Sequence, residues 1–208
     1  MQKKDVSMAV IRRIPKYYRY LDELYSKGIT RISSRKLAES MGLTASQVRQ
    51  DFNCFGEFGQ QGYGYNVETL RKELSAILGI NRRNKAIIIG VGNIGHALLN
   101  NFDFDQCGFT ILAAFDTNPE IIGTKVNDIE IYNIDKLSEI CSKNRIDVAV
   151  LTLPKKYAPE MAEKLGQLGV LGIWNFTNID LKLKNHNVTV EDVHFADSLM
   201  TLRFRTGK

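Results

Sequence analysis

The chain has 208 residues, of which 44% are hydrophobic and 25% are charged, as in an ordinary globular protein of one or two domains. Residues 1–85 carry a net charge of +8 and residues 86–208 a net charge of −3, so the first part favours contact with a polyanion, unless it is simply a solvated basic surface. There is no signal-peptide core and no apolar run long enough to span a membrane, so a soluble, cytoplasmic protein is expected.

The cysteines and histidines argue against a metal site. Cys54, Cys107 and Cys141 are far apart and form no CxxC pair, so neither a zinc site nor a disulfide framework is predicted. We expect each to be a reduced, packed thiol. The three histidines lack the spacing of metal ligands as well.

The first clear helical pattern covers residues 14–26. Its apolar and aromatic residues recur three and one positions apart, which places them on one face of a helix. Pro15 suits the first turn of this helix, and Gly28 can adopt the left-handed conformation that ends one.

Two short helices follow and together predict a helix-turn-helix. Ser34 is the expected N-cap of a helix over residues 35–41, which stops at Gly42. Thr44 and Gln47 fit a capping box that opens the second helix, so its first turn carries small and polar side chains suited to the major groove of DNA. The expected DNA contacts of this motif are Ser34, Arg35, Thr44, Ser46, Gln47, Arg49 and Gln50.

A glycine-rich segment comes next. Four glycines alternate with aromatic and amide residues over residues 56–65, which predicts a short β-hairpin, the wing of a winged helix. Gln61, Gly62 and Tyr63 are its expected contacts to phosphate or to the minor groove. An ordinary flexible hairpin is the alternative. Asn66 then caps an amphipathic helix that completes a DNA-binding domain over residues 1–79.

A nucleotide-binding pattern begins after a polar linker over residues 80–85. The apolar strand 86–89 leads into a GxGxxG loop, and a helical stretch follows. The first glycine allows a tight turn, the second lets a pyrophosphate approach the backbone, and the third lets helix and strand pack closely. The loop consists of Gly90, Gly92, Asn93, Ile94 and Gly95 together with Val91.

The second strand of this pattern ends in an acidic residue. Asp116 lies 21 residues after Gly95, close to the interval at which a carboxylate accepts hydrogen bonds from the adenosine ribose. Because this carboxylate would repel a 2′-phosphate, NADH and NAD⁺ are favoured over their phosphorylated counterparts. The alternative is an aspartate that merely shapes the turn over residues 116–119.

Further strands and helices alternate over residues 109–176. This rhythm predicts an α/β fold with a Rossmann doubly wound parallel sheet over residues 86–191. Thr152, Leu153 and Pro154, with residues 175–177, are expected beside the nicotinamide half of the site, because ligands bind at the carboxyl ends of such strands. Trp174 and Phe176 are interpreted as core residues. Residues 192–205 predict a final amphipathic helix that docks elsewhere.

The combination of motifs resembles the Rex family of redox-sensing transcriptional repressors. The resemblance rests on QVRQDFNCFGEFGQQGYGY, on the linker LGINRR and on IIIGVGNIGHAL, and it covers nearly the whole chain. It implies a homodimer that exchanges its C-terminal helices, residues 192–208. It also implies binding to a palindromic double-stranded operator at a low NADH/NAD⁺ ratio and release when NADH binds.

The resemblance also assigns roles to single residues. Phe195 matches the apolar residue that the exchanged helix presents near the partner's nicotinamide. Arg19 matches an arginine of the switch that links NADH to DNA release. In the family pattern an aspartate stands where this chain has His194, and a tyrosine where it has Asn101. Because His194 and Arg19 cannot form a salt bridge, the resemblance implies a switch with other contacts here.

Two further function classes fit parts of the sequence. A small NAD-dependent oxidoreductase would share the glycine loop, but the 123 residues from 86 to 208 leave no room for a separate substrate domain. No convincing general acid or base is present, since His96 reads as a solvated helix residue. A CoA-binding module would share the strand and loop, but Asp116 favours a bare ribose over the 3′-phosphorylated ribose of CoA.

Overall fold

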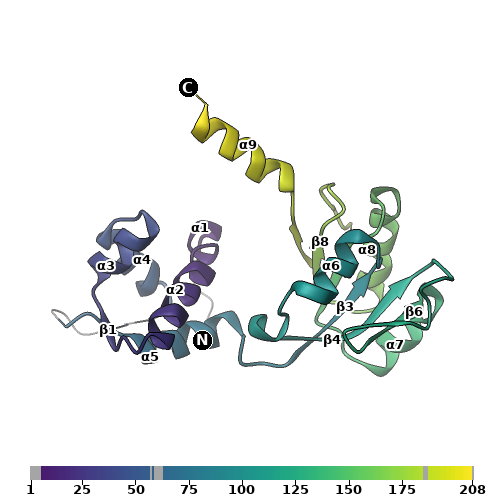
Figure 1. Cartoon of the computed structure of the whole chain (residues 1–208), viewed down its shortest axis with the longest axis horizontal. Coiled ribbons are helices and arrows are strands. Elements are labelled where there is room, and N and C mark those ends of the chain that lie inside the picture. Colours follow the sequence, from purple (N-terminus) through teal and green to yellow (C-terminus); the bar gives the residue numbers. More distant parts are fainter. Residues whose placement is uncertain (1–5, 57, 59–62, 185–186, 208) are drawn as a thin grey trace. The chain divides into compact units, whose positions relative to one another are not determined.

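The computed structural model describes residues 6–56, 58, 63–184 and 187–207. The chain divides into two compact units, Met1–Asn81 and Arg82–Lys208 (Figure 1). Each unit has its own hydrophobic core.

The N-terminal unit consists of helices and one small two-stranded sheet. Its elements are α1 (Met8–Ile11), α2 (Ile14–Ser26), β1 (Arg31–Ile32), α3 (Ser34–Met41), α4 (Ala45–Asn53), β2 (Tyr65–Asn66) and α5 (Val67–Leu78). Helix α2 has the bounds that its periodicity predicts, and its apolar face is buried. Asn66 caps α5 as expected, because its side-chain oxygen accepts a hydrogen bond from the backbone N–H of Thr69.

The N-cap of α3 differs from the prediction by one residue. Ser33, not Ser34, has the extended backbone of an N-cap, and its hydroxyl accepts a hydrogen bond from the backbone N–H of Lys36. Ser34 is therefore the first residue of the helix. Two adjacent serines offer the same capping chemistry, so the sequence alone does not choose between them.

The described part of the expected wing pairs with a strand that lies before the helix-turn-helix. Ile32 pairs with Tyr65 and Arg31 with Asn66 in an antiparallel arrangement. Gly64 crosses this pair so closely that a β-carbon would lie 2.6 Å from the carbonyl oxygen of Ile32. Its φ of 70° also requires glycine.

The C-terminal unit is built on a seven-stranded sheet with the strand order β5-β6-β4-β3-β7-β8-β9. All neighbouring strands are parallel except β5 and β6. Its elements are β3 (Asn84–Ile89), α6 (Asn93–Asn101), η1 (Asp105–Cys107), β4 (Phe109–Asp116), β5 (Lys125–Val126), β6 (Ile129–Asn133), η2 (Ile134–Lys136), α7 (Leu137–Lys143), β7 (Val148–Leu151), η3 (Lys155–Tyr157), α8 (Ala158–Gln167), β8 (Gly172–Asn175), β9 (Thr189–Asp192) and α9 (Phe195–Thr206).

Helices cover both faces of this sheet, as the predicted doubly wound fold requires. Ile87 and Ile89 of β3 pack in one core with α7 and α8, whereas Ile88 packs in a second core with Leu99 of α6. The six parallel strands follow the Rossmann order, which reverses direction between β3 and β7. In folds of this kind, ligands bind at the carboxyl ends of the strands where the order reverses.

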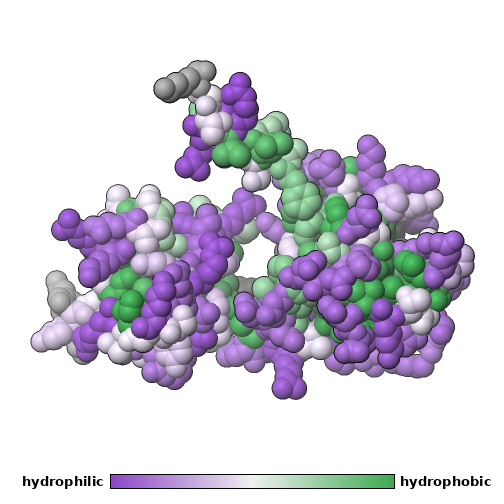
Figure 2. Space-filling model, viewed as in Figure 1, coloured by the Kyte–Doolittle hydropathy of each residue, from purple (hydrophilic) through white to green (hydrophobic). Residues whose placement is uncertain are grey.

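The last helix begins later than predicted. The expected helix over residues 192–205 is wrong at its start, because residues 189–192 form β9, which pairs with β8. Helix α9 starts at Phe195, with His194 at its N-cap, and none of its residues is buried. Figure 2 shows hydrophobic side chains on the surface of this helix.

The three cysteines differ in their exposure to solvent. All three cysteines are free. Cys141 is buried, Cys54 is half-buried and Cys107 is exposed, so the expectation of packed thiols is wrong for Cys107.

Within the described residues, no helix has both the length and the apolar character needed to cross a membrane.

Candidate functional site

Helix α4 presents its polar residues on the exposed side of the N-terminal unit. The Thr44 hydroxyl accepts a hydrogen bond of 3.2 Å from the backbone N–H of Gln47, so the predicted cap is present. The reciprocal half of the capping box is absent, because the Gln47 side chain donates to Asp51 instead. Val48 and Phe52 are buried, whereas Ser46, Arg49 and Gln50 are exposed.

The two helices of the motif are joined by a polar contact on their exposed side. The Arg49 guanidinium donates to the Ser34 hydroxyl at 3.1 Å, which brings two predicted DNA contacts together. Arg35 forms an exposed ion pair of 2.9 Å with Glu39 of its own helix. An exposed pair of this kind is weak, so Arg35 can exchange it for a phosphate.

The glycine-rich segment is described only in part. Gln61 and Gly62 lie outside the described residues. Tyr63 is 69% exposed, and the Arg31 guanidinium lies 5.8 Å from the centre of its ring. Arg31 is a basic residue that the sequence analysis did not select. Arg31 is identified by the structure, because its pairing with Asn66 in the small sheet places it beside the expected wing.

A buried carboxylate on the inner side of α4 was also missed. Asp51 is wholly buried and accepts hydrogen bonds from the guanidinium of Arg13, the hydroxyl of Tyr17 and the amide of Gln47. Burial alone raises the pKa of the Asp51 carboxyl, but these hydrogen bonds outweigh burial, and the pKa lies below its usual value. The signal in the sequence is an acidic residue on the same helix face as Val48 and Phe52.

The glycine loop of the C-terminal unit has no room for side chains at two positions. A β-carbon on Gly95 would lie 2.1 Å from the carbonyl oxygen of Gly90, and one on Gly90 would lie 2.8 Å from the backbone nitrogen of Leu153. The Thr152 hydroxyl donates to the Gly90 carbonyl at 2.6 Å. The loops after β3 and β7 therefore meet where the strand order reverses.

The second glycine is different, because the space beside it is open. No atom lies within 4 Å of the position that a β-carbon on Gly92 would occupy. Gly92 is the N-cap of α6, no side chain caps this terminus, and Asn93 and Ile94 are exposed. The first backbone N–H groups of a helix have no partner within it, so this opening suits an anionic group such as a pyrophosphate.

Asp116 lies beside the glycine loop and is already engaged by backbone groups. One carboxylate oxygen accepts a hydrogen bond of 2.6 Å from Val91, and the other accepts bonds from Thr117 and Asn118. A carboxylate has about four lone-pair positions, so roughly one is left for a ribose hydroxyl. Asp116 thus shapes the turn and holds the loop, and can still accept one further bond.

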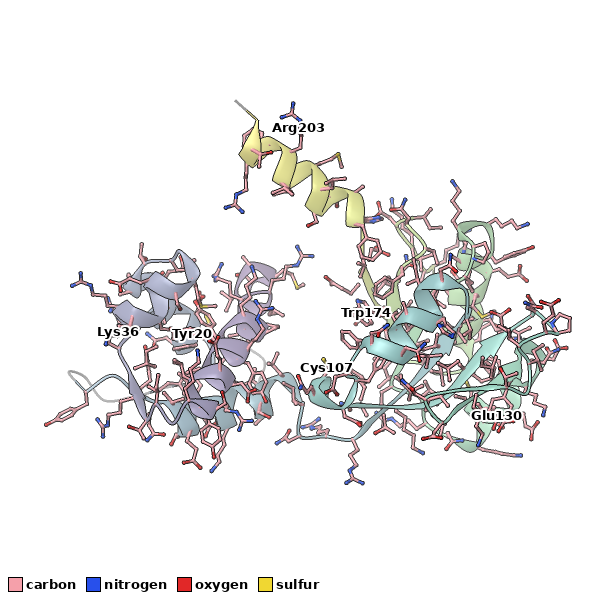
Figure 3. The ribbon with its side chains drawn as sticks, viewed as in Figure 1. Tyr20, Lys36, Cys107, Glu130, Trp174 and Arg203 are labelled. Carbon is pink, nitrogen blue, oxygen red and sulfur yellow. The ribbon has the colours of Figure 1, made fainter. Side chains whose placement is uncertain are left out.

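The end of β8 forms a second polar cluster at the same edge of the sheet. The oxygen of the buried Asn175 amide accepts hydrogen bonds from the backbone and hydroxyl of Thr177. Trp174, which Figure 3 labels, is half-buried. The centre of its ring lies 4.5 Å from that of Phe176 and 5.3 Å from that of Phe102, which follows α6. Trp174 and Phe176 therefore pack as expected. Phe195, which is 62% exposed, lies 6.0 Å from Phe176 of the same chain, ring centre to ring centre.

Each of the three residues assigned to the switch is described within its own unit. The ring of His194 makes hydrogen bonds of 2.9 Å with Asp180 and 3.3 Å with Asn178. The bond to Asp180 raises the pKa of His194 above its usual value. Asn101 donates to the Ala97 carbonyl of its own helix, and Arg19 is exposed on α2.

The described residues hold no group of three or more histidine, cysteine or acidic side chains placed to bind a metal. His96 is exposed, and its ring is 3.0 Å from the amide of Asn100 on the same helix. This arrangement supplies no pair of groups for acid–base catalysis.

Both halves of the chain match known families. Residues 5–53 match the family described as Putative DNA-binding protein N-terminus. Residues 81–179 match the family described as CoA binding domain.

Full-length relatives and solved structures match as well. The redox-sensing transcriptional repressor Rex of Clostridium botulinum (strain Hall) is 53% identical over 97% of this chain and 95% of its own, and that of Clostridium acetobutylicum is 49% identical over 97% and 94%. The crystal structure of RSP in complex with β-NAD⁺ and operator DNA has a TM-score of 0.91 and 48% identity over 98% of this chain and 93% of that one. The complex of RSP with β-NADH has a TM-score of 0.89 and 45% identity over 98% and 95%.

Proposed function

The chain belongs to the Rex family of redox-sensing transcriptional repressors, and we propose that it binds operator DNA at a low NADH/NAD⁺ ratio and leaves it when NADH binds. The named relatives are repressors rather than enzymes, and no catalytic residue is assigned. Because a repressor must reach its operator DNA, we propose a cytoplasmic location.

One observation carries this proposal: a single chain holds both a capped recognition helix and an open glycine loop. Arg49 and Ser34 meet on the exposed side of α4, and Gly92 leaves a space at the start of α6 that a side chain would fill. The exposed side of α4 suits DNA, a polyanion whose base edges side chains can contact in the major groove. The space beside Gly92 suits a dinucleotide.

The DNA-binding surface lies on residues 1–79. The residues assigned to it are Ser34, Arg35, Thr44, Ser46, Gln47, Arg49 and Gln50, the wing residues Gln61, Gly62 and Tyr63, and Arg31 beside the wing. Helix α4 is the element that enters the major groove. A palindromic operator is expected, because two copies of the chain related by a twofold axis bind two half-sites.

The dinucleotide is assigned to residues 86–191, where the loop fits it. Gly92 and the start of α6 would hold the pyrophosphate, Asp116 would accept one ribose hydroxyl, and Thr152, Leu153 and Pro154 would border the nicotinamide. When bound, the cofactor supplies its redox state, because the reduced ring is neutral and the oxidised ring carries a positive charge. An apolar wall from Phe195 favours the neutral ring, since burying the charged one costs more free energy.

A homodimer follows from the C-terminal helix. Five large apolar residues of α9 are 55–85% exposed in the single chain, which a monomer would leave in water. We assign residues 192–208 to exchange between subunits, with Phe195 reaching the partner's site. In this chain His194 is bonded to Asp180, so we propose that the switch through Arg19 and Asn101 does not use a pair between His194 and Arg19.

CoA is the alternative ligand, because residues 81–179 match a CoA-binding family. The position of Asp116 disfavours it. A 3′-phosphate on the adenosine ribose would come close to a carboxylate that three backbone N–H groups already hold in place. Competition between CoA and NADH for the full-length protein separates the two ligands.

The proposal is tested with a duplex that the protein itself selects from a randomised pool. Fluorescence anisotropy should show that micromolar NADH releases this duplex and that NAD⁺ does not. Arg49→Ala should weaken duplex binding by about 1–3 kcal/mol and leave NADH binding unchanged. A wild-type chain that selects no sequence, or that is not released by NADH, would refute the proposed function.

A further inference from the structure

The carboxylate of Asp51 is saturated with hydrogen-bond donors. One oxygen accepts from Arg13 Nη2 at 2.8 Å and from Gln47 Nε2 at 2.9 Å. The other accepts from Arg13 Nε at 2.6 Å and from the Tyr17 hydroxyl at 2.7 Å. All four lone-pair positions of the group are therefore in use.

Stability alone is a poor explanation for this network. Buried ion pairs are often replaced by apolar residues without loss of stability, because removing two charges from water offsets their attraction. Val48 and Phe52 already supply an apolar face that holds α4 against the core. The network makes a specific connection. Through Asp51, it links Arg13, at the N-cap of α2, and Tyr17 of α2 to a single residue in the first turn of α4.

That residue is Gln47, in the first turn of α4, which is half-buried between the core and the exposed side. Because an ionised carboxylate only accepts hydrogen bonds, the atom of Gln47 that faces Asp51 must be the nitrogen Nε2. The amide cannot flip without losing this bond. A glutamine held in this way loses less conformational freedom when it binds DNA than one that is free to rotate.

We infer that Asp51, supported by Arg13 and Tyr17, is a positioning residue for base reading, because it orients the side-chain amide of Gln47 from the inner side of the recognition helix. The inference rests on the proposed function and names the residues that give it sequence selectivity. One N–H of the Gln47 amide is used by Asp51, and the amide keeps its second N–H as a donor and its carbonyl oxygen as an acceptor. That is the pair with which glutamine reads the N7 and N6 edge of adenine.

The inference separates selective from non-selective DNA binding. Phosphate contacts supply affinity for any duplex, and base contacts supply the preference for one sequence. Asp51 is itself wholly buried and cannot touch a phosphate, so its loss should leave phosphate contacts in place and reduce the sequence preference. A purely structural role would weaken binding to all duplexes together.

The test uses the full-length chain, the duplex that the wild type selects from a randomised pool, and a scrambled duplex of the same length. Gln47→Ala and Asp51→Asn should each reduce the ratio of the two affinities by roughly 10- to 100-fold, the discrimination of one hydrogen-bonded base contact. Affinity for the scrambled duplex should change by less than about twofold. The double variant should lose no more than Gln47→Ala alone, because Asp51 acts through Gln47.

Two further variants keep the test decisive. Glu23→Gln also removes one negative charge from the N-terminal unit, but from an exposed ion pair with Lys27, and should leave the ratio unchanged. Tyr17→Phe removes one donor from Asp51 with little change in volume, and should lower the ratio by a smaller factor even if Asp51→Asn does not fold. Additive losses in the double variant, or equal weakening toward both duplexes, would overturn the inference. If the wild type selects no duplex, the proposed function itself fails.

Discussion

Helices α2 and α9 have 13 and 12 residues, but the chain buries the apolar residues of one and exposes those of the other. Ile14, Tyr17, Leu21 and Leu24 of α2 are 0–7% exposed, whereas the large apolar residues of α9 are 55–85% exposed. Exposed apolar surface of this kind marks an interaction site. The difference supports our proposal that α9 packs against a second copy of the chain, whereas α2 is buried within its own unit.

Deletion of α9 is expected to have the largest effect. A chain that ends at residue 194 should be a monomer in sedimentation, because the surface that joins two copies is gone. Its affinity for a palindromic duplex should fall by about 100-fold or more, since the second half-site no longer adds to binding. NADH binding to the glycine loop should persist in part. A truncated chain that remains fully dimeric would contradict the exchange of α9.

Replacing one leucine in each helix with alanine tests the same difference between α2 and α9. Leu21→Ala should lower the free energy of unfolding by about 2–5 kcal/mol, because Leu21 is fully buried, and should leave the dimer dissociation constant unchanged. Leu199→Ala should raise the dimer dissociation constant and leave the unfolding of the monomer unchanged. Sedimentation and denaturant unfolding measure the two effects separately. The opposite pattern would place the partner of α9 within its own chain.

The glycine loop resembles α2 in that its contacts lie within its own unit, and Asp116 beside it tests the cofactor that the loop binds. Asp116→Asn keeps an acceptor for the turn but removes the negative charge. It should reduce the preference for NADH over NADPH by on the order of tenfold, about 1.4 kcal/mol. Asp135→Asn, a change of the same charge on η2, is the control. If the wild type binds both cofactors equally, Asp116 does not contact the ribose.

The smallest effect is expected at the start of α9. Because its bond to Asp180 raises the pKa of His194, the protonated ring stabilises the folded chain. This contribution is present below the ordinary pKa of histidine and is lost as the pH rises through the raised value. In Asp180→Asn the pKa of His194 should fall toward its usual range, as followed by NMR of the ring protons. An unchanged titration would show that Asp180 does not hold the ring.

Local patterns in the sequence predicted much of this structure. The period of apolar residues gave the bounds of α2, and side-chain caps placed the starts of α4 and α5. The glycine loop was predicted from its local spacing, and the structure leaves no room for a side chain at Gly90 and Gly95 and an open space beside Gly92. Such features depend on residues only a few positions apart, so they can be predicted from a short stretch of sequence.

Most features that were missed depend on distant residues, and one had a local signal. Strand β9 looked like the start of a helix, because only its pairing with β8 makes it a strand. The hairpin of β5 and β6 had a local signal that was not used, namely Asn127 and Asp128, which have φ angles of 45° and 66° in its turn. Asp51 could be placed on the buried side of α4, but its donors Arg13 and Tyr17 lie more than 30 residues away.

The central claim is that NADH and operator DNA bind this protein with negative coupling. The most direct measurement is the affinity of the full-length protein for NADH, by calorimetry, with and without a saturating amount of the selected duplex. Coupling is reciprocal, so the duplex should weaken NADH binding by the same factor by which NADH weakens duplex binding, about 5- to 150-fold. Equal affinities for NADH in both conditions would contradict the claim.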